Sequence, residues 1–251
     1  MRPAVYIPNY NGARRIGSAL ESLREQSRPL DVVVADNGSS DDSVELVRER
    51  FPEVTLLELG SNLGFGPALN RAVAEHRADP LILLNDDAVA APRFVEALLD
   101  AHATGAESVA GVMTQERAPQ LIDSAGVVAD RTLMGFDYLH GEPLAAAAGA
   151  PDPLGPTGGA ALYSRAAFER VGGFDERIFL YYEDLDLALR LAAAGARCRL
   201  APAATALHSY SASLGAGSGA KYERTGWSRG YMLRRYGVMG SPRNAARVLA
   251  I

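Results

Sequence analysis

The sequence predicts an α/β fold in which a mostly parallel central sheet is flanked by helices. Three observations support this prediction. Short apolar runs that suit buried strands alternate, over residues 1–112, with segments whose apolar residues recur at helical spacing. Clusters of Asn, Gly, Ser and Asp separate these segments and mark turns. Two of the apolar runs end abruptly in carboxylates. Such an alternation is typical of strand–helix–strand units with right-handed crossovers.

Four apolar runs are the predicted strands of this sheet. The first covers residues 4–8 and is closed by Pro8, after which Asn-Tyr-Asn-Gly forms a turn. The second covers residues 31–36 and the third residues 54–59. The fourth covers residues 80–85 and contains the uninterrupted apolar run Leu-Ile-Leu-Leu. We expect both of its faces to be covered, as is usual in parallel sheets.

A helix is expected after each of these strands. Apolar residues recur every three or four positions in residues 16–23 and again in residues 69–76. Another helix is predicted to begin near Ser43, because the polar loop before it offers several residues that cap helices. The fourth follows Pro92.

Beyond residue 112 the pattern weakens. Residues 114–157 have no clear periodicity, and the Ala- and Pro-rich residues 144–153 are predicted to form a mobile loop. The elements expected after this region are a short helix at residues 166–171, a helix at 184–194, strand-like segments at 197–200 and 204–208, a Gly- and Ser-rich stretch at 214–220 and a basic, aromatic helix at 222–236.

Composition narrows the classes of function. A net charge of -5 argues against a broad surface that binds nucleic acid. The one cysteine, Cys198, excludes an internal disulfide and a cysteine-based zinc site. No apolar run approaches the roughly 20 residues that span a bilayer, and no signal-peptide pattern is present. We therefore expect a cytoplasmic protein, with peripheral contact to the inner face of the membrane left open.

Carboxylates at the strand ends point to a ligand site. Asp36 closes the second strand, and Asp86 and Asp87 directly follow the fourth. Ligands of open α/β sheets bind outside the carboxyl ends of the strands. Two neighbouring carboxylates repel each other unless a cation or a proton relieves them, and Mg²⁺ shared with substrate phosphates is the natural partner. A polar loop that caps the next helix would explain the same residues without a ligand. No P-loop or dinucleotide-binding glycine pattern is present.

A second acidic cluster begins the helix at residues 184–194. Glu183 and Asp184 lie in or just before its first turn. The helix dipole alone favours acidic residues there, so structure and catalysis explain this pair about equally well.

The ordered motifs resemble the inverting glycosyltransferases of family 2, and most of all their bacterial rhamnosyltransferase-like branch. The resemblance covers residues 1–236 and implies the GT-A fold, a Rossmann-like fold of nucleotide-diphospho-sugar transferases. The matching motifs are the opening strand at residues 4–11, the second-strand motif at 34–41, the segment at 62–70, a DXD-like element at 85–87 and an ED pair at 183–184.

The resemblance also implies a role for each matching residue. Asp87 would bind Mg²⁺ or Mn²⁺, and His208 stands where many members place a histidine that helps to hold the metal or the pyrophosphate. Asp184 would be the catalytic base, and Glu183 would orient the acceptor or support the site. Asp36 would contact the base of the nucleotide. The residues expected around the donor are Pro8, Tyr10, Asn11, Asp36, Asn62, Gly64, Asn70, Asn85 and Asp86.

The implied activity is metal-dependent, inverting transfer of a sugar from a nucleotide-diphospho sugar to an acceptor hydroxyl. The donor would be dTDP-rhamnose or another dTDP, UDP or GDP sugar. The acceptor would be a glycan, a lipid-linked sugar or a small molecule. Two alternatives stay open: a sugar nucleotidylyltransferase, and a non-catalytic domain that binds nucleotide sugars. Asn9-Tyr10-Asn11-Gly12 suits the first poorly because it lacks a basic residue for a triphosphate, and an inactive relative would be expected to lose its acidic pairs.

We expect a single glycosyltransferase domain over residues 1–251. Residues 1–112 would bind the nucleotide sugar, residues 113–220 would carry the acceptor and catalytic groups, and residues 221–251 would form a helical tail. The aromatic and basic residues of this tail, with Trp227 among them, would face a lipid surface or pack across the domain, and packing is the simpler interpretation.

Overall fold

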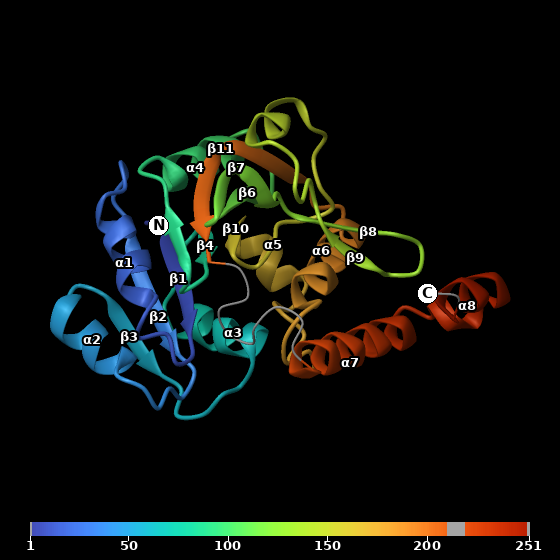
Figure 1. Cartoon of the computed structure of the whole chain (residues 1–251), viewed down its shortest axis with the longest axis horizontal. Helices are drawn as coiled ribbons and strands as arrows, with labels where there is room; N and C mark the ends of the chain where they lie inside the picture. The colour runs from blue at the N-terminus through green and yellow to red at the C-terminus, as the bar shows by residue number, and fades with distance from the viewer. Residues whose placement is uncertain (1, 210–218, 250–251) are drawn as a thin grey trace.

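The structure is a computed structural model that describes residues 2–209 and 219–249 (Figure 1). Most of the Gly- and Ser-rich stretch at residues 214–220 lies outside the described residues. The first half consists of β1 (Ala4–Asn9), α1 (Ile16–Arg24), β2 (Asp31–Asp36), α2 (Ser43–Arg50), β3 (Thr55–Glu58), α3 (Phe65–Glu75), β4 (Leu81–Leu84), β5 (Ala88–Ala90) and α4 (Phe94–Ala103).

The second half contains more strand than the sequence predicts. Its elements are β6 (Ser108–Gln115), β7 (Ala118–Ser124), β8 (Val127–Ala129), β9 (Gly135–Asp137), η1 (Leu144–Gly149), β10 (Ala160–Tyr163), α5 (Arg165–Arg170), α6 (Glu183–Ala193), β11 (Cys198–His208), α7 (Gly219–Arg235), η2 (Val238–Gly240) and α8 (Pro242–Leu249). The two strand-like segments predicted near the end are one strand, β11, whose register shifts between Leu200 and Thr205.

The prediction of a mobile loop at residues 144–153 is wrong. This segment contains the 3-10 helix η1, and the Ala147 side chain is buried in a cluster with Ile122 and Leu200. The Asp152 carboxylate accepts a hydrogen bond from the backbone N–H of Leu200 at 2.8 Å. Ala147 therefore packs against the sheet, whereas Ala145, Ala146 and Ala148 are exposed.

The main sheet has the strand order β3-β2-β1-β4-β10-β6-β11-β5, with β7 paired to β6. The predicted parallel pairing joins β3, β2, β1 and β4, and it also joins β6 to β11. β10 enters antiparallel between β4 and β6, and β5 runs antiparallel to β11. The start of β10 therefore lies at the same edge as the carboxyl ends of β1, β2 and β4.

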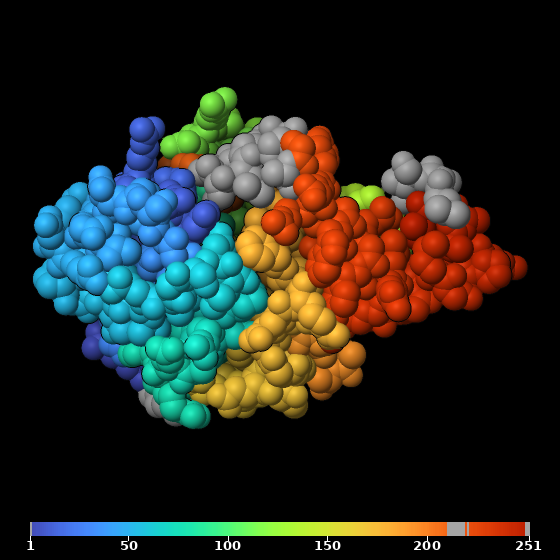
Figure 2. Space-filling view, turned by 90° about the horizontal axis from the view of Figure 1, so that it is seen from below, coloured from blue at the N-terminus to red at the C-terminus, as the bar shows by residue number. Residues whose placement is uncertain are grey.

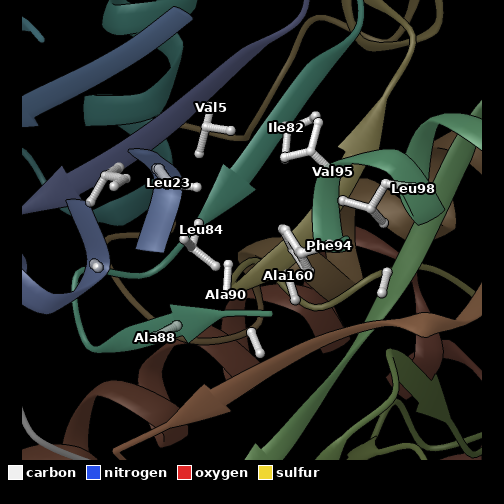
Figure 3. Packing of buried hydrophobic residues seen from close by; sticks show 14 of the residues in the cluster. Val5, Leu23, Ile82, Leu84, Ala88, Ala90, Phe94, Val95, Leu98 and Ala160 are labelled. Carbon is white, nitrogen blue, oxygen red and sulfur yellow. The ribbon is translucent and has the colours of Figure 1, made fainter. Parts of the chain in front are cut away.

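Helices cover both faces of the sheet, as predicted. Alternate residues of each strand enter opposite cores because side chains in a strand alternate between its faces. Val5 and Ile82 pack with α1, α2 and α4 on one face, where Figure 3 shows Phe94 and Leu98 against the strands. Tyr6 and Leu83 pack with α3, α5 and α6 on the other face.

The carboxylate of Asp175 attaches α7 to the rest of the molecule. Tyr231 donates a hydrogen bond to it at 2.7 Å, Arg177 pairs with it at 2.9 Å, and Arg235 also pairs with it. Burial opposes the charged form, but the hydrogen bonds from Arg177 and Tyr231 outweigh burial and hold the pKa of Asp175 well below its usual range. The ionised carboxylate therefore stabilises the docked helix.

Replacing Asp175 with Asn is expected to destabilise the protein by about 1–3 kcal/mol, the value of hydrogen bonds to a buried charge. Because the pKa of Asp175 is depressed in the folded chain, its contribution is complete above about pH 4 and is lost as the pH falls further. Urea unfolding at pH 7 and at pH 3 checks this. The difference in free energy of unfolding between the variant and the parent should be smaller at pH 3 than at pH 7. An equal difference at both pH values would contradict the stabilising role of the ionised Asp175 carboxylate.

Candidate active site

The carboxyl ends of β1 and β2 form one side of the site. Asn9 donates from Nδ2 to Asp36 Oδ1 at 2.8 Å and to Ser43 Oγ at 3.0 Å. Asp36 is buried, and its Oδ2 accepts a hydrogen bond from the backbone N–H of Ser39 at 3.1 Å. The amide oxygen of Asn9 is buried without a hydrogen-bond partner among the described residues.

The turn after β1 packs on the loop after β2. The backbone N–H of Asn11 donates to Ser39 Oγ at 2.9 Å, and Asn11 Oδ1 accepts from the backbone N–H of Ser40 at 2.8 Å. Pro8 is half-buried in β1, and the Tyr10 side chain is exposed at the rim. Among the described residues that are predicted to contact the donor here, Tyr10 is exposed, whereas Pro8 and Asn11 are half-buried.

The predicted donor residues Asn62, Gly64 and Asn70 hold α3 in place. Asn62 Oδ1 accepts from the backbone N–H of Gly64 at 3.1 Å. Gly64 has a φ of +97°, and a side chain there would collide with the backbone carbonyl of Phe179. The Asn70 amide exchanges two hydrogen bonds of 2.9 Å with the backbone of Phe174. These contacts tie the start of α3 to the segment that leads into α6.

Asp86 lies next to the Asn9 network. Its carboxylate pairs with Arg15 Nη2 at 2.8 Å. Burial raises the pKa of Asp86 to about 6, although the charge of Arg15 opposes the rise. A side chain at Gly12 would collide with both Asn9 Oδ1 and Asp86 Oδ2, so these two oxygens approach the same point.

Asp87 lies beside His208, as the predicted metal pair requires. The distance between His208 Nε2 and Asp87 Oδ1 is 3.2 Å, and His208 Nδ1 lies 2.6 Å from Asp123 Oδ2. Burial lowers the pKa of His208, but the hydrogen bonds with Asp123 and Asp87 outweigh burial and raise the pKa to about 10. The Asn85 amide lies 3.5 Å from His208 Nε2.

The chemistry of this pair fits a divalent cation. Within the described ranges, no group of three or more His, Cys, Asp and Glu side chains is arranged to hold a metal ion. Mg²⁺ needs fewer protein ligands than that because it keeps waters and substrate phosphates in its coordination shell. Asp123 fixes the His208 ring so that Nε2 points at Asp87, which is how outer carboxylates orient metal-binding histidines.

Glu183 and Asp184 begin α6 and differ in their surroundings. Asp184 accepts hydrogen bonds from the backbone N–H groups of Leu185 at 2.8 Å and Gly158 at 3.4 Å. Glu183 is buried, and its Oε2 has no partner among the described residues. Burial raises the pKa of both carboxyls, and the charge of Asp184 raises that of Glu183 further. Glu183 is therefore the one held in its neutral form.

Residues 157–159 connect this acidic pair to the end of β4. The backbone N–H of Asn85 donates to the carbonyl of Gly159 at 3.3 Å, and Gly158 donates to Asp184. Together with the approach of Asn9 to Asp86, these contacts bring Asp36, Asp87 and Asp184 into one continuous region at the carboxyl edge of β1, β2 and β4.

A cavity of about 190 Å³ opens beside Asp184. Its walls include Phe136 from β9, Tyr181 and Tyr182 before α6, and Thr225 from α7. Both tyrosines have positive φ angles, +66° and +70°, in the turn that leads into α6. A larger cavity, of about 310 Å³, lies between α4 and residues 199–203 and contains none of these carboxylates.

Three residues of the site escaped the sequence prediction. Asp123, Asn9 and Arg15 contact His208, Asp36 and Asp86, respectively. Asp123 follows Leu-Ile in β7. A carboxylate directly after apolar residues is also the pattern that identifies Asp36. This signal lies inside a region without periodicity, where the sequence predicts no strand that Asp123 could end.

The sequence of this chain is similar to those of known glycosyltransferases. The family model described as "Glycosyl transferase family 2" matches residues 4–172. A curated relative, the N-acetylglucosaminyl-diphospho-decaprenol L-rhamnosyltransferase of Mycobacterium tuberculosis, is 34% identical over 185 residues, which are 64% of this chain and 60% of the relative. The chain thus spans about 60% of the length of that relative.

Solved structures share the fold at low sequence identity. GalNAc-T7 with UDP, GalNAc and Mn²⁺ superposes with a TM-score of 0.71 and 14% identity, over 91% of this chain and 47% of that one. The mannosyltransferase PcManGT of Pyrobaculum calidifontis, in complex with GDP-Man and Mn²⁺, superposes with a TM-score of 0.67 and 22% identity, over 99% of this chain and 68% of that one. TarS from S. aureus superposes with a TM-score of 0.61 and 18% identity, over 83% of this chain and 60% of that one. These matches confirm the predicted GT-A fold. The family model covers more than half of the chain, so the protein belongs to glycosyl transferase family 2.

Proposed function

We propose that this protein transfers a sugar from a nucleotide-diphospho sugar to an acceptor hydroxyl with inversion, assisted by Mg²⁺ or Mn²⁺. The observation that carries the proposal is the continuous region that joins Asp36 and Asp87 to Asp184, with a cavity that Asp184 lines. L-Rhamnose on dTDP is the first donor to consider, because a rhamnosyltransferase is among the relatives. Solved neighbours in complex with UDP and with GDP-Man add UDP and GDP sugars.

The donor binds along the carboxyl edge of β1, β2 and β4. Asp36 and Tyr10 contact the nucleoside, and the diphosphate lies beside Asp87 and His208. Asp87 and His208 would hold the cation, and Asp123 keeps the His208 ring in place. The chemistry that a divalent cation supplies there is neutralisation of the charge that develops on the leaving diphosphate.

Asp184 accepts the proton of the attacking hydroxyl. The two backbone N–H groups and the amino end of α6 stabilise its charged form, whereas Glu183 stays neutral. Two adjacent carboxyls whose environments separate their pKa values commonly divide the work of base and neutral partner. A single displacement with one base inverts the anomeric centre.

The acceptor sugar enters the cavity beside Asp184, with the ring of Phe136 at its mouth. The named activity of the M. tuberculosis relative suggests a sugar linked by diphosphate to a polyprenol as the acceptor class. Phe136→Ala is expected to raise the KM for the acceptor about three- to tenfold, the value of one aromatic contact, and to leave the KM for the donor unchanged. Steady-state kinetics checks this, with Tyr10→Ala as the contrasting variant that should raise the KM for the donor. An unchanged acceptor KM in Phe136→Ala would place the acceptor elsewhere.

The test of the proposed function is a donor screen that follows release of nucleoside diphosphate. Sugars on dTDP, UDP and GDP are offered with Mn²⁺ or with a chelator, in the presence of lipid-diphosphate-linked N-acetylglucosamine. We expect one donor to be consumed, in a metal-dependent manner. Release of pyrophosphate from a sugar phosphate and a nucleoside triphosphate would instead identify a nucleotidylyltransferase.

A further inference from the structure

The end of the described chain differs in charge from the rest. Residues 219–249, named here the C-terminal arm, consist of α7, η2 and α8. They contain seven basic residues and one acidic residue, a net charge of +6, whereas the whole chain carries -5. The remainder therefore carries -11, and the positive charge is concentrated in this one segment.

One face of the arm is occupied by contacts with the body. Ser228 donates to the carbonyl of Leu180 at 3.0 Å, and Met232 and Leu233 are buried in an apolar cluster with residues of β8 and α6. Tyr236 donates to Asp186 Oδ1 at 2.8 Å. This is the packing that the sequence favoured, and it fixes which side of α7 faces outward.

Other side chains of the arm are exposed. Arg234, Arg243 and Arg247 form no ion pair with any residue in the described ranges. The side chains of Tyr222, Trp227 and Met239 are 70%, 54% and 43% exposed. In Figure 1 α7 and α8 extend away from the sheet, and Figure 2 shows the arm as a protrusion from the body. Among residues 2–209 and 219–249, no helix has both the length and the apolar character needed to cross a bilayer.

We propose that the C-terminal arm binds the surface of a bilayer that contains anionic lipids. Unpaired arginines are attracted to anionic head groups, and exposed Trp and Tyr side chains favour the boundary between head groups and acyl chains. The charge of the arm, opposite to that of the body, orients the molecule with the arm toward the lipid and the body away from it.

The arm also connects this surface to the acceptor cavity. Thr225 of α7 lines the cavity that contains Asp184, and Arg224 of the same helix lies 4.5 Å from the ring centre of Phe179. Binding of α7 to lipid would hold the cavity near the head groups, where the diphosphate of a lipid-linked acceptor resides. This last step rests on the proposed function, whereas binding of the arm to lipid does not.

The proposal is tested by sedimentation of the whole chain with vesicles, without donor or acceptor. Vesicles of phosphatidylcholine alone are compared with vesicles that also contain phosphatidylglycerol. Binding should require phosphatidylglycerol and should weaken as salt is added. The double variant Arg243→Glu/Arg247→Glu should bind more than about tenfold less tightly, since each basic residue contributes about fivefold near an anionic surface.

A matched variant controls for net charge. Arg71→Glu/Arg77→Glu makes the same change in charge at two exposed positions on and after α3, and it should bind as the parent does. Circular dichroism reports whether each variant is folded. If the arm variant Arg243→Glu/Arg247→Glu is unfolded, Trp227→Ser is measured in its place. Absence of binding to anionic vesicles, an equal loss in both double variants, or self-association in light scattering that the arm variant abolishes would each overturn the proposal. Because nucleoside diphosphate release is measured separately, failure here leaves the transferase proposal standing.

Discussion

Replacing Asp184 with Asn is expected to reduce sugar transfer by about 10²- to 10⁴-fold, the usual contribution of a general base. The amide keeps the shape of the side chain but cannot accept the proton of the attacking hydroxyl. Binding of the donor should survive, because the proposed donor site lies along the ends of β1, β2 and β4 and does not include Asp184. Transfer kinetics and calorimetry with nucleoside diphosphate measure the two effects separately.

Glu183→Gln is the matched control for this prediction. Burial and the neighbouring charge of Asp184 raise the pKa of Glu183, so the glutamine resembles the neutral form that is already present. We expect a far smaller loss of transfer than in Asp184→Asn. Full activity in Asp184→Asn, or an equal loss in both variants, would remove the assignment of Asp184 as the base.

The pH dependence of transfer should report the same carboxyl. Burial and the charge of Asp137 raise the pKa of Asp184 above its usual range. A base acts only when it is deprotonated, so kcat should fall on the acid side at a higher pH than the ordinary aspartate value of about 4. This acid limb should be absent from the residual activity of Asp184→Asn.

Replacing Asp87 with Ala is expected to abolish the part of donor affinity that depends on Mn²⁺. The carboxylate is one of two protein groups, with His208, that would bind the cation between protein and diphosphate. Titration calorimetry of the donor with and without Mn²⁺ should show a metal-dependent gain of at least about tenfold in the parent, equivalent to about 1.4 kcal/mol, and none in the variant.

Asp100→Asn provides the comparison for this loss, because it removes a carboxylate from the exposed face of α4. Its donor affinity should respond to Mn²⁺ as in the parent. An unchanged response in Asp87→Ala would place the cation elsewhere and would leave the pairing of His208 with Asp123 as a structural contact.

The sequence reveals most of the sheet and the acidic ends of its strands. Val33 and Ile82 lie in unbroken apolar runs, and such runs predict buried strands reliably enough to place Asp36 and Asp87 at one edge. The antiparallel entry of β10 could not be predicted, because the direction of pairing depends on contacts with β4 and β6 that are distant in sequence. The contact of Asp123 with His208 likewise joins residues 85 positions apart, and periodicity carries no information about such pairs.

The predicted roles around α3 illustrate the same limit. Asn70 matches a motif associated with the donor, but its amide bonds to the backbone of Phe174, which no local pattern indicates. The motif marks a segment of the chain, but the bonding partner of the Asn70 side chain depends on a second segment that is distant in sequence.

The contacts between α3 and the segment before α6 have a consequence for engineering of this enzyme. The backbone N–H of Phe65 donates to the carbonyl of Phe179 at 2.9 Å, and Asn70 donates to the carbonyl of Phe174, so the proposed floor beneath the nucleotide is hydrogen-bonded to the segment that leads to Asp184. Substitutions in α3 chosen to accept a new nucleotide would therefore also disturb turnover. Selection for donor preference should begin at Tyr10, whose side chain is exposed at the rim.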